Sequence, residues 1–170
     1  MGRPARYFRA GVGAVIFNRR GQVLLLERAD VPGAWQFPQG GLDEGETPVE
    51  GARREAEEET GIPASALRLK GRYPDLLAYE LPERARTKRT GLGQVQYWFY
   101  FETGAVDVPL EKLPPGEFRA ARWVSFDRAV ADTVAFRTPL YKKLRSFART
   151  LNRVPRRTGQ AVARRRREHP

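Results

Sequence analysis

Five glutamates crowd one short segment of a chain whose formal net charge is +11, namely Glu50, Glu55, Glu57, Glu58 and Glu59. Three of them, Glu55, Glu58 and Glu59, are spaced i, i+3, i+4 and therefore share one face of a helix. Carboxylate clusters suit hard divalent cations, whereas zinc favours His and Cys. The chain has one His and no Cys. The pattern therefore predicts a Mg²⁺ or Mn²⁺ site.

The helix that carries these carboxylates is marked at both ends. Thr47 and Glu50 are spaced as a capping box, and Pro48 suits the first helical position. Gly61 suits the left-handed position after the last helical residue. We predict a helix over Pro48–Thr60. Its acidic residues then lie at the end where the helix dipole disfavours negative charge, which indicates that they bind a cation.

A solvated helix with i,i+4 ion pairs is the alternative interpretation. The pairs would be Arg53–Glu57 and Arg54–Glu58. In both pairs Arg precedes Glu, which is the weaker orientation, so simple solvation explains the arrangement poorly.

The wider spacing resembles the Nudix box, the signature of hydrolases acting on nucleoside diphosphates linked to another group. The pattern is G, five residues, E, seven residues, R-E-A-x-E-E-x-G-I, filled by Gly40, Glu46, Arg54, Glu55, Ala56, Glu58, Glu59, Gly61 and Ile62. The preceding W-Q-F-P-Q-G-G run resembles the bacterial RNA pyrophosphohydrolases and the dinucleoside polyphosphate hydrolases. The similarity covers roughly Tyr7 to Leu151, and it implies an α+β fold, the Nudix α/β/α sandwich around a mixed sheet.

The resemblance also implies roles for the residues of the box. The metal ligands are expected to be Glu55, Glu58 and Glu59, joined by the backbone carbonyl of Gly40 and by the distant Glu117. We assign the general base to Glu55, with Glu58 as the next candidate. The structural residues of the motif are expected to be Glu46, Arg54 and Gly61, with Arg54 orienting a carboxylate and Glu46 bracing the loop before the helix.

Substrate contacts are expected from cations and from one flat ring. The positions carried over from the family are Arg9, Arg28, Tyr79, Gln94, Phe136 and Arg137, with Phe136 as the stacking residue. Two of them have a structural alternative, because Phe136 could belong to the core and Tyr79 to a half-buried strand.

Composition favours one domain, residues 1–151, followed by a basic tail, residues 152–170, which we expect to be disordered or loosely helical. The absence of cysteine, of a long apolar run and of a signal peptide favours a cytoplasmic protein without a membrane segment. A basic segment, Glu83 to Arg89, is expected to form a loop that attracts polyanions.

The elements that must position these residues are mostly strands. We predict a hairpin of 7–17 with 22–27, a short strand at 35–37, and strands at 67–73, 76–81, 94–102 and 119–125. A short helix at 125–131 and a terminal helix from Thr138 to about Leu151 complete the domain.

The leading functional hypothesis is hydrolysis of the 5′-triphosphate end of RNA to a monophosphate. Cleavage of dinucleoside polyphosphates uses the same groups and is the second hypothesis, and clean-up of damaged nucleoside triphosphates is a third, disfavoured by the W-Q-F-P-Q-G-G run. A catalytically silent RNA-binding module is the alternative of another class, but such a module would be expected to lack one of the box glutamates, and all are present.

Overall fold

The computed structural model describes residues 6–105, 107, 108 and 110–151. The strands are β1 (Phe8–Phe17), β2 (Val23–Arg28), β3 (Trp35–Gln36), β4 (Gln39–Gly41), β5 (Arg68–Arg72), β6 (Leu77–Glu80), β7 (Gly93–Glu102) and β8 (Phe118–Val124). The helices are α1 (Pro48–Thr60), α2 (Phe126–Asp132) and α3 (Thr138–Leu151), with 3₁₀ turns at Ala64–Ala66, Glu83–Ala85, Leu110–Lys112 and Ala135–Arg137.

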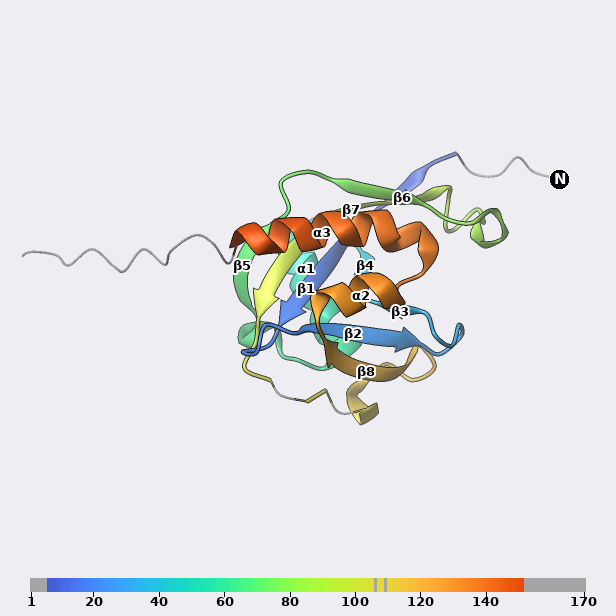
Figure 1. The fold of residues 1–170 in the computed structure, drawn as a ribbon. Coiled ribbons are helices and arrows are strands. Elements are labelled where there is room, and N and C mark those ends of the chain that lie inside the picture. The colour runs from blue at the N-terminus through green and yellow to red at the C-terminus, as the bar shows by residue number, and fades with distance from the viewer. Residues whose placement is uncertain (1–5, 106, 109, 152–170) are drawn as a thin grey trace, which may run out of the picture.

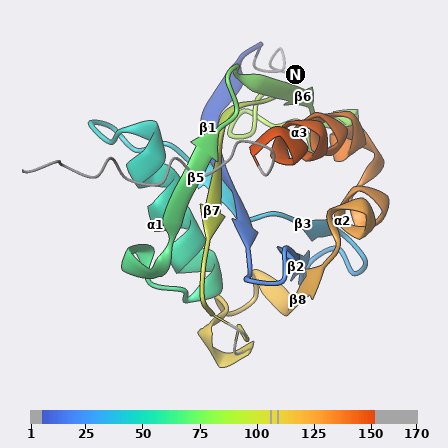
Figure 2. The same cartoon turned by 60° about the vertical axis from the view of Figure 1, so that its left-hand side comes forward.

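One mixed sheet runs through the domain, with α1 on one face and α2 and α3 on the other (Figures 1 and 2). Its centre is β1 paired in parallel with β7 from Phe8↔Gly93 to Phe17↔Glu102. Both faces are covered, so side chains alternate between two cores. Val12 packs toward Ala52 and Ala56 of α1, while Val15 packs on the α3 side. The expected α/β/α sandwich is confirmed.

The predicted hairpin of the first two strands is present but short. β2 pairs antiparallel with β1 at Phe17↔Val23, next to the turn, and then pairs with β8. β4, which the sequence did not reveal as a strand, takes the place beside β1. Glycine makes this close approach possible, because a Cβ on Gly11 would lie 2.7 Å from the Gly40 carbonyl oxygen. Toward β7, a Cβ on Gly13 would lie 2.5 Å from the Trp98 ring.

The boundaries of α1 are those predicted from its capping residues. The Glu50 carboxylate accepts hydrogen bonds from the Thr47 backbone N–H at 3.0 Å and from its hydroxyl at 2.5 Å. Gly61 has a φ of 69° and donates its N–H to the Glu57 carbonyl at 2.7 Å, which ends the helix.

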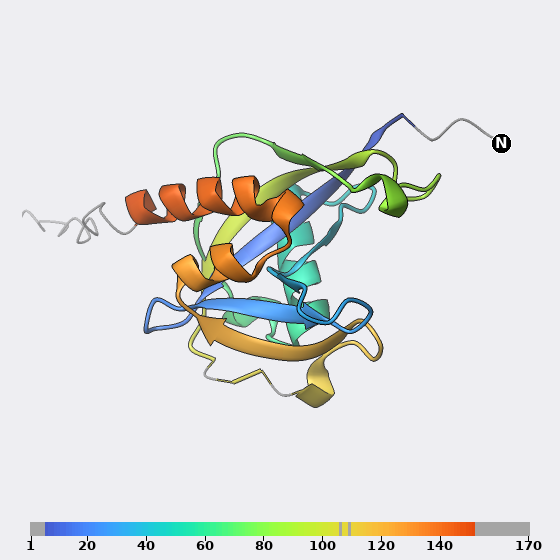
Figure 3. The same ribbon diagram turned by 45° about the vertical axis from the view of Figure 1, so that its right-hand side comes forward.

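Three connecting segments gather at one end of the sheet, as Figures 1 and 3 show. They are the β2–β3 loop, the turn before β8 and the loop between β6 and β7. The β2–β3 loop is held by Glu27, whose carboxylate accepts the Gly33 N–H at 2.7 Å and pairs with Arg119 at 3.0 Å. The Gly33 hydrogen bond is the largest cause that lowers the pKa of Glu27, and the Arg119 guanidinium lowers it further.

Glu27→Gln should therefore reduce the free energy of unfolding at neutral pH by about 1–2 kcal/mol, because it weakens hydrogen bonds to a charged, nearly buried acceptor. The folded-state pKa lies below the unfolded value of 4.5, so the stabilisation is complete above that value and fades as the pH falls through the folded-state pKa. Urea unfolding across an acid pH series should show the two proteins converging in acid. The exposed Glu44→Gln is the matched control, and a constant difference between wild type and Glu27→Gln at all pH values would contradict the assignment.

Candidate active site

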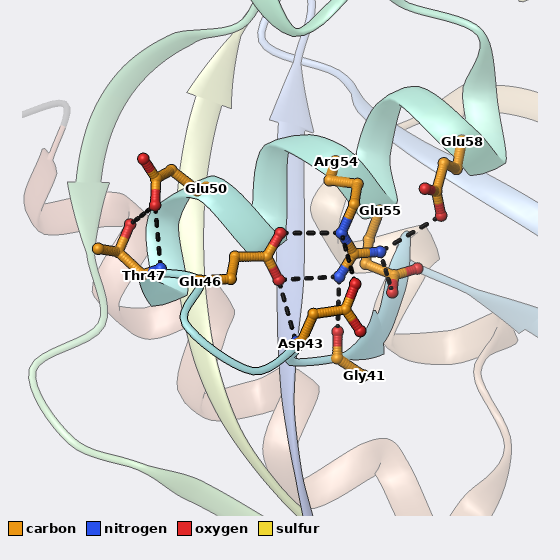
Figure 4. Close-up of polar contacts among 8 residues, drawn as sticks. All are labelled: Gly41, Asp43, Glu46, Thr47, Glu50, Arg54, Glu55 and Glu58. Carbon is orange, nitrogen blue, oxygen red and sulfur yellow. Dashed lines mark hydrogen bonds and ion pairs between the residues drawn. The ribbon is translucent and has the colours of Figure 1, made fainter.

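One guanidinium, that of Arg54, organises the box (Figure 4). Its Nε and Nη2 donate to the two carboxylate oxygens of Glu46 at 2.8 and 2.9 Å, and Nη2 also donates to the Gly41 carbonyl at 3.0 Å. Its Nη1 donates to Glu55 at 2.8 Å and to Glu58 at 3.3 Å. Arg54 thus joins the loop before α1 to two carboxylates on the helix. This is a bidentate arrangement that lysine does not reproduce.

The three predicted metal-binding carboxylates differ in their surroundings. Glu59 is only 5% exposed and accepts the Gln39 N–H at 3.0 Å, Glu55 is partly buried, and Glu58 is exposed. Burial raises the pKa of Glu55, against the opposing effect of Arg54. Burial also raises the pKa of Glu59 well above its usual range, and the negative charges of Glu55 and Glu117 act in the same direction. Both carboxylates would be stabilised by a nearby cation.

Gly40 lies directly against Glu55. A Cβ at this position would lie 2.1 Å from one Glu55 carboxylate oxygen, so only glycine leaves room for the carboxylate. The potential metal ligands around Gly40 and Glu55 are all oxygen atoms, which suit a hard divalent cation. Within the described residues, however, no three His, Cys, Asp or Glu side chains are already gathered around a common metal position. The carboxylates of Glu55 and Glu58 are turned to Arg54 instead.

A cavity of about 460 Å³ opens beside the buried carboxylate of Glu59. Its lining includes Glu59 and Gln39 from the box side and Glu117 from the turn before β8. Arg137 lines it too, although that residue is only 5% exposed. The Arg137 guanidinium donates to Gln36 Oε1 at 2.6 Å and to the Tyr79 hydroxyl at 3.3 Å, and its Nε has no hydrogen-bond partner among the residues that the structure describes. Among the described residues no carboxylate pairs with it, so the cavity presents a buried positive charge together with the buried Glu59 and the exposed Glu117.

Comparison with known proteins shows which family has this arrangement of residues. The model of the NUDIX domain matches residues 7–144. An RNA pyrophosphohydrolase of Rhodospirillum rubrum is 46% identical over 142 residues, which cover 81% of this chain and 84% of that protein. The chain belongs to the NUDIX domain family.

Further comparisons agree with this Nudix assignment. An RNA pyrophosphohydrolase of Cereibacter sphaeroides is 39% identical, with 81% of this chain and 88% of that protein covered. The structure of the E. coli dihydroneopterin triphosphate pyrophosphohydrolase matches with a TM-score of 0.69 at 25% identity, covering 85% of this chain and 99% of that one. The predicted fold and the predicted class, a Nudix hydrolase, are confirmed. Nudix hydrolases generally use divalent metal ions.

Three of the predicted substrate residues of this Nudix hydrolase line the cavity: Arg28, Gln94 and Arg137. Arg28 is held by Asp30 through two hydrogen bonds of 2.8 and 2.6 Å, and Asp30 also lines the cavity. The Gln94 side chain is hydrogen-bonded by Gln96 at 2.8 Å. Glu117, a predicted metal ligand, is exposed at the rim.

The other three predicted substrate residues lie outside the cavity lining. Tyr79 is 6% exposed and lies behind Arg137 and Gln39, so the structural alternative describes it better in this conformation. Phe136 packs on Tyr79 with ring centroids 5.6 Å apart and lies under the Arg137 guanidinium. Arg9 is exposed, and its guanidinium would be 3.5 Å from a Cβ on Gly41. Their contact with substrate stays a prediction.

Two glutamines and one aspartate were not assigned a role from the sequence. Gln36 and Gln39 stand in the W-Q-F-P-Q-G-G run, whose resemblance to the family was the available signal. Gln36 holds Arg137, and the Gln39 backbone holds Glu59. Asp30 carried no signal in the sequence, because a single acid in a loop resembles any surface residue.

In the part of the chain that the structure describes, no helix is long and apolar enough to span a membrane. The predicted basic tail, residues 152–170, lies outside the described residues, and its conformation stays a prediction.

Proposed function

We propose that this protein hydrolyses the 5′-triphosphate end of RNA to a monophosphate with the help of Mg²⁺ or Mn²⁺. The observation that carries the proposal is the buried Arg137 guanidinium, which lacks a carboxylate partner among the described residues and shares a cavity with Glu59 and Glu117. A polyphosphate would supply a negatively charged partner for the Arg137 guanidinium. A divalent cation would offset the repulsion between that polyphosphate and the carboxylates of Glu59 and Glu117. The two relatives named RNA pyrophosphohydrolase, identical at 46% and 39%, support RNA as the substrate.

The groups proposed to hold the metal are the carboxylates of Glu55, Glu58, Glu59 and Glu117 with the carbonyl oxygen of Gly40. When bound, a divalent cation neutralises phosphate charge and makes a coordinated water more acidic. Arg54 orients Glu55 and Glu58, because its guanidinium donates to both. Arg28 and Arg137, which also line the cavity, bind phosphate oxygens.

Glu55 is proposed to act as the general base. A water oxygen attacks a phosphorus of the triphosphate, the P–O bond between the α- and β-phosphates breaks so that pyrophosphate separates from the monophosphate end, and the proton of the water passes to Glu55. Its burial suits this role, because a raised pKa brings the carboxylate closer to the pH at which it works. Glu58 is exposed and lies further from Gly40 along the helix, which supports the ranking of Glu55 before Glu58.

Turnover of triphosphorylated RNA and of diadenosine tetraphosphate, measured side by side over a salt series, tests the proposal. We expect faster turnover of RNA and a steeper fall with salt, because RNA carries more phosphates to contact. Chelation of divalent metal should abolish both reactions. RNA turnover that is insensitive to salt and far slower than dinucleotide turnover would establish the dinucleoside polyphosphate hydrolase instead. Failure to hydrolyse either substrate, even with divalent metal present, would favour the catalytically silent RNA-binding module.

The cytoplasmic location stays a prediction.

A further inference from the structure

The loop between β6 and β7, residues 83–91, is strongly basic and will be called the basic loop. Its charged side chains are Glu83, Arg84, Arg86, Lys88 and Arg89. Arg86 is the one that is paired, to Glu80 at 2.8 Å, and it also donates to the Leu81 carbonyl at 2.8 Å. Within the described residues Arg84, Lys88 and Arg89 are exposed and form no ion pair. The loop therefore presents three cations that nothing in the described fold neutralises.

Hydrogen bonds within and beneath the basic loop hold it in one shape. The Thr87 hydroxyl accepts the N–H groups of Arg89 and Thr90 at 3.1 and 3.0 Å, and the Thr90 hydroxyl donates to the Ala85 carbonyl at 2.8 Å. The Tyr7 hydroxyl donates to the carbonyls of Lys88 and Arg89 at 2.5 and 3.1 Å. A binding surface held in advance loses less entropy when it takes a ligand.

The basic loop also adjoins the cavity. Gln94 lines the cavity and lies on β7, whose first residue follows closely after the loop. Arg9 pairs with Gln94 across the parallel strands, so one more exposed cation lies on the strand beside Gln94. The loop lies at the same end of the sheet as the β2–β3 loop and the turn before β8, both of which line the cavity (Figure 3).

The cavity and the basic loop can hold different parts of an RNA substrate. The cavity, at about 460 Å³, suits a terminal nucleotide with its phosphates. A chain that leaves the cavity beside Gln94 comes close to Arg9, the strand partner of Gln94, and to the basic loop, which ends just before β7. A free nucleotide has no phosphate to place there, whereas a longer RNA has one for every residue.

We propose that the basic loop binds the phosphate backbone of single-stranded RNA downstream of the 5′-terminal nucleotide, so that it favours RNA chains over small nucleotides. This rests on the proposed function, since it takes the cavity as the place of the 5′ end. Contacts of this kind are electrostatic and independent of sequence.

Binding of 3′-labelled RNA that carries a non-hydrolysable, methylene-bridged 5′-triphosphate to the full chain, followed by fluorescence anisotropy with Mg²⁺ present, tests the proposal. Two lengths are compared: a dinucleotide RNA and one of about 20 nucleotides, which exceeds the roughly 4–16 nucleotides that one small domain covers. The variant is R84A/R89A. The matched control is R19A/R20A, which removes two exposed arginines from the β1–β2 turn at the opposite end of the sheet.

We expect R84A/R89A to bind the longer RNA about tenfold more weakly at low salt, with the slope of log affinity against log salt shallower by about 1.4. Binding of the dinucleotide RNA and of diadenosine tetraphosphate should stay at the wild-type level. Tyr7→Phe should produce a smaller loss of the same kind, because it releases the loop without removing a charge. Thermal unfolding of each variant checks that the fold is kept.

Three outcomes would overturn the proposal: equal affinity of the wild type for the two lengths, an equal loss in R19A/R20A, or unchanged binding by R84A/R89A. A failure of the proposed function is seen separately, as absence of phosphate release from triphosphorylated RNA of either length with Mg²⁺ present. The binding comparison still decides the role of the basic loop in that case.

Discussion

Replacing Glu55 by glutamine should lower kcat about a thousandfold, the middle of the usual range for removal of a general base. Glutamine keeps the size of the side chain and an oxygen that accepts the Arg54 Nη1 hydrogen bond, so the arrangement around Arg54 should persist. It cannot take a proton from water. Single-turnover hydrolysis of triphosphorylated RNA at saturating Mg²⁺ measures the effect, and thermal unfolding should show an intact fold.

Two further variants make the Glu55 result specific. Glu44→Gln alters an exposed acid in the loop before α1 and should leave kcat unchanged. Glu58→Gln should lower kcat less than Glu55→Gln does. Near-normal turnover of Glu55→Gln would show that the base is another group, and a larger loss in Glu58→Gln would identify that group as Glu58.

Replacing Arg137 by methionine should lower kcat/KM for triphosphorylated RNA about a hundredfold, as expected when a preorganised donor to a charged group is removed. Methionine keeps much of the packing against Phe136 and Tyr79 but removes the charge. Arg137→Lys should recover only part of the loss, since an ammonium cannot reach Gln36 and Tyr79 in the same geometry. Initial rates over a range of RNA concentrations give the comparison.

Arg145→Met is the matched control, because Arg145 pairs with Asp127 between α2 and α3, away from the cavity. It should change stability slightly and kcat/KM not at all. Unchanged kcat/KM in Arg137→Met would mean that this guanidinium serves only to hold Gln36 and Tyr79 in place. The proposal that it binds phosphate would then be wrong.

Local chemistry explains why so much of α1 could be predicted. The capping pair Thr47 and Glu50 and the left-handed Gly61 act within a few residues, and the structure places the helix ends where they indicate. β4 could not be predicted, because a Gln-Gly-Gly strand has no alternating apolar pattern. It exists because Gly11 and Gly40 allow two backbones to approach, which is a tertiary fact.

In the candidate site, too, some features follow from local sequence and others depend on tertiary packing. The charges of the box and their helical spacing pointed to Glu55, Glu58 and Glu59 alike, but not to the burial that distinguishes Glu55 and Glu59 from Glu58. Tyr79 and Phe136 have the residue types of a base-stacking site, yet they pack on each other because the Ala135–Arg137 turn before α3 meets β6 there. A single sequence does not reveal which of two aromatic rings faces solvent.

The parallel pairing of β1 with β7 has a consequence for synthesis on the ribosome. The first strand has its longest partner far along the chain, and loop closure over such a distance is slow compared with local folding. During translation α1 can form early and β1 can pair with β4, but the other edge of β1 stays unpaired until β7 emerges, and Arg137 follows later still. The nascent chain therefore carries its acidic helix long before it has a cavity, and the enzyme can gain activity only after the segment that carries Arg137 has emerged.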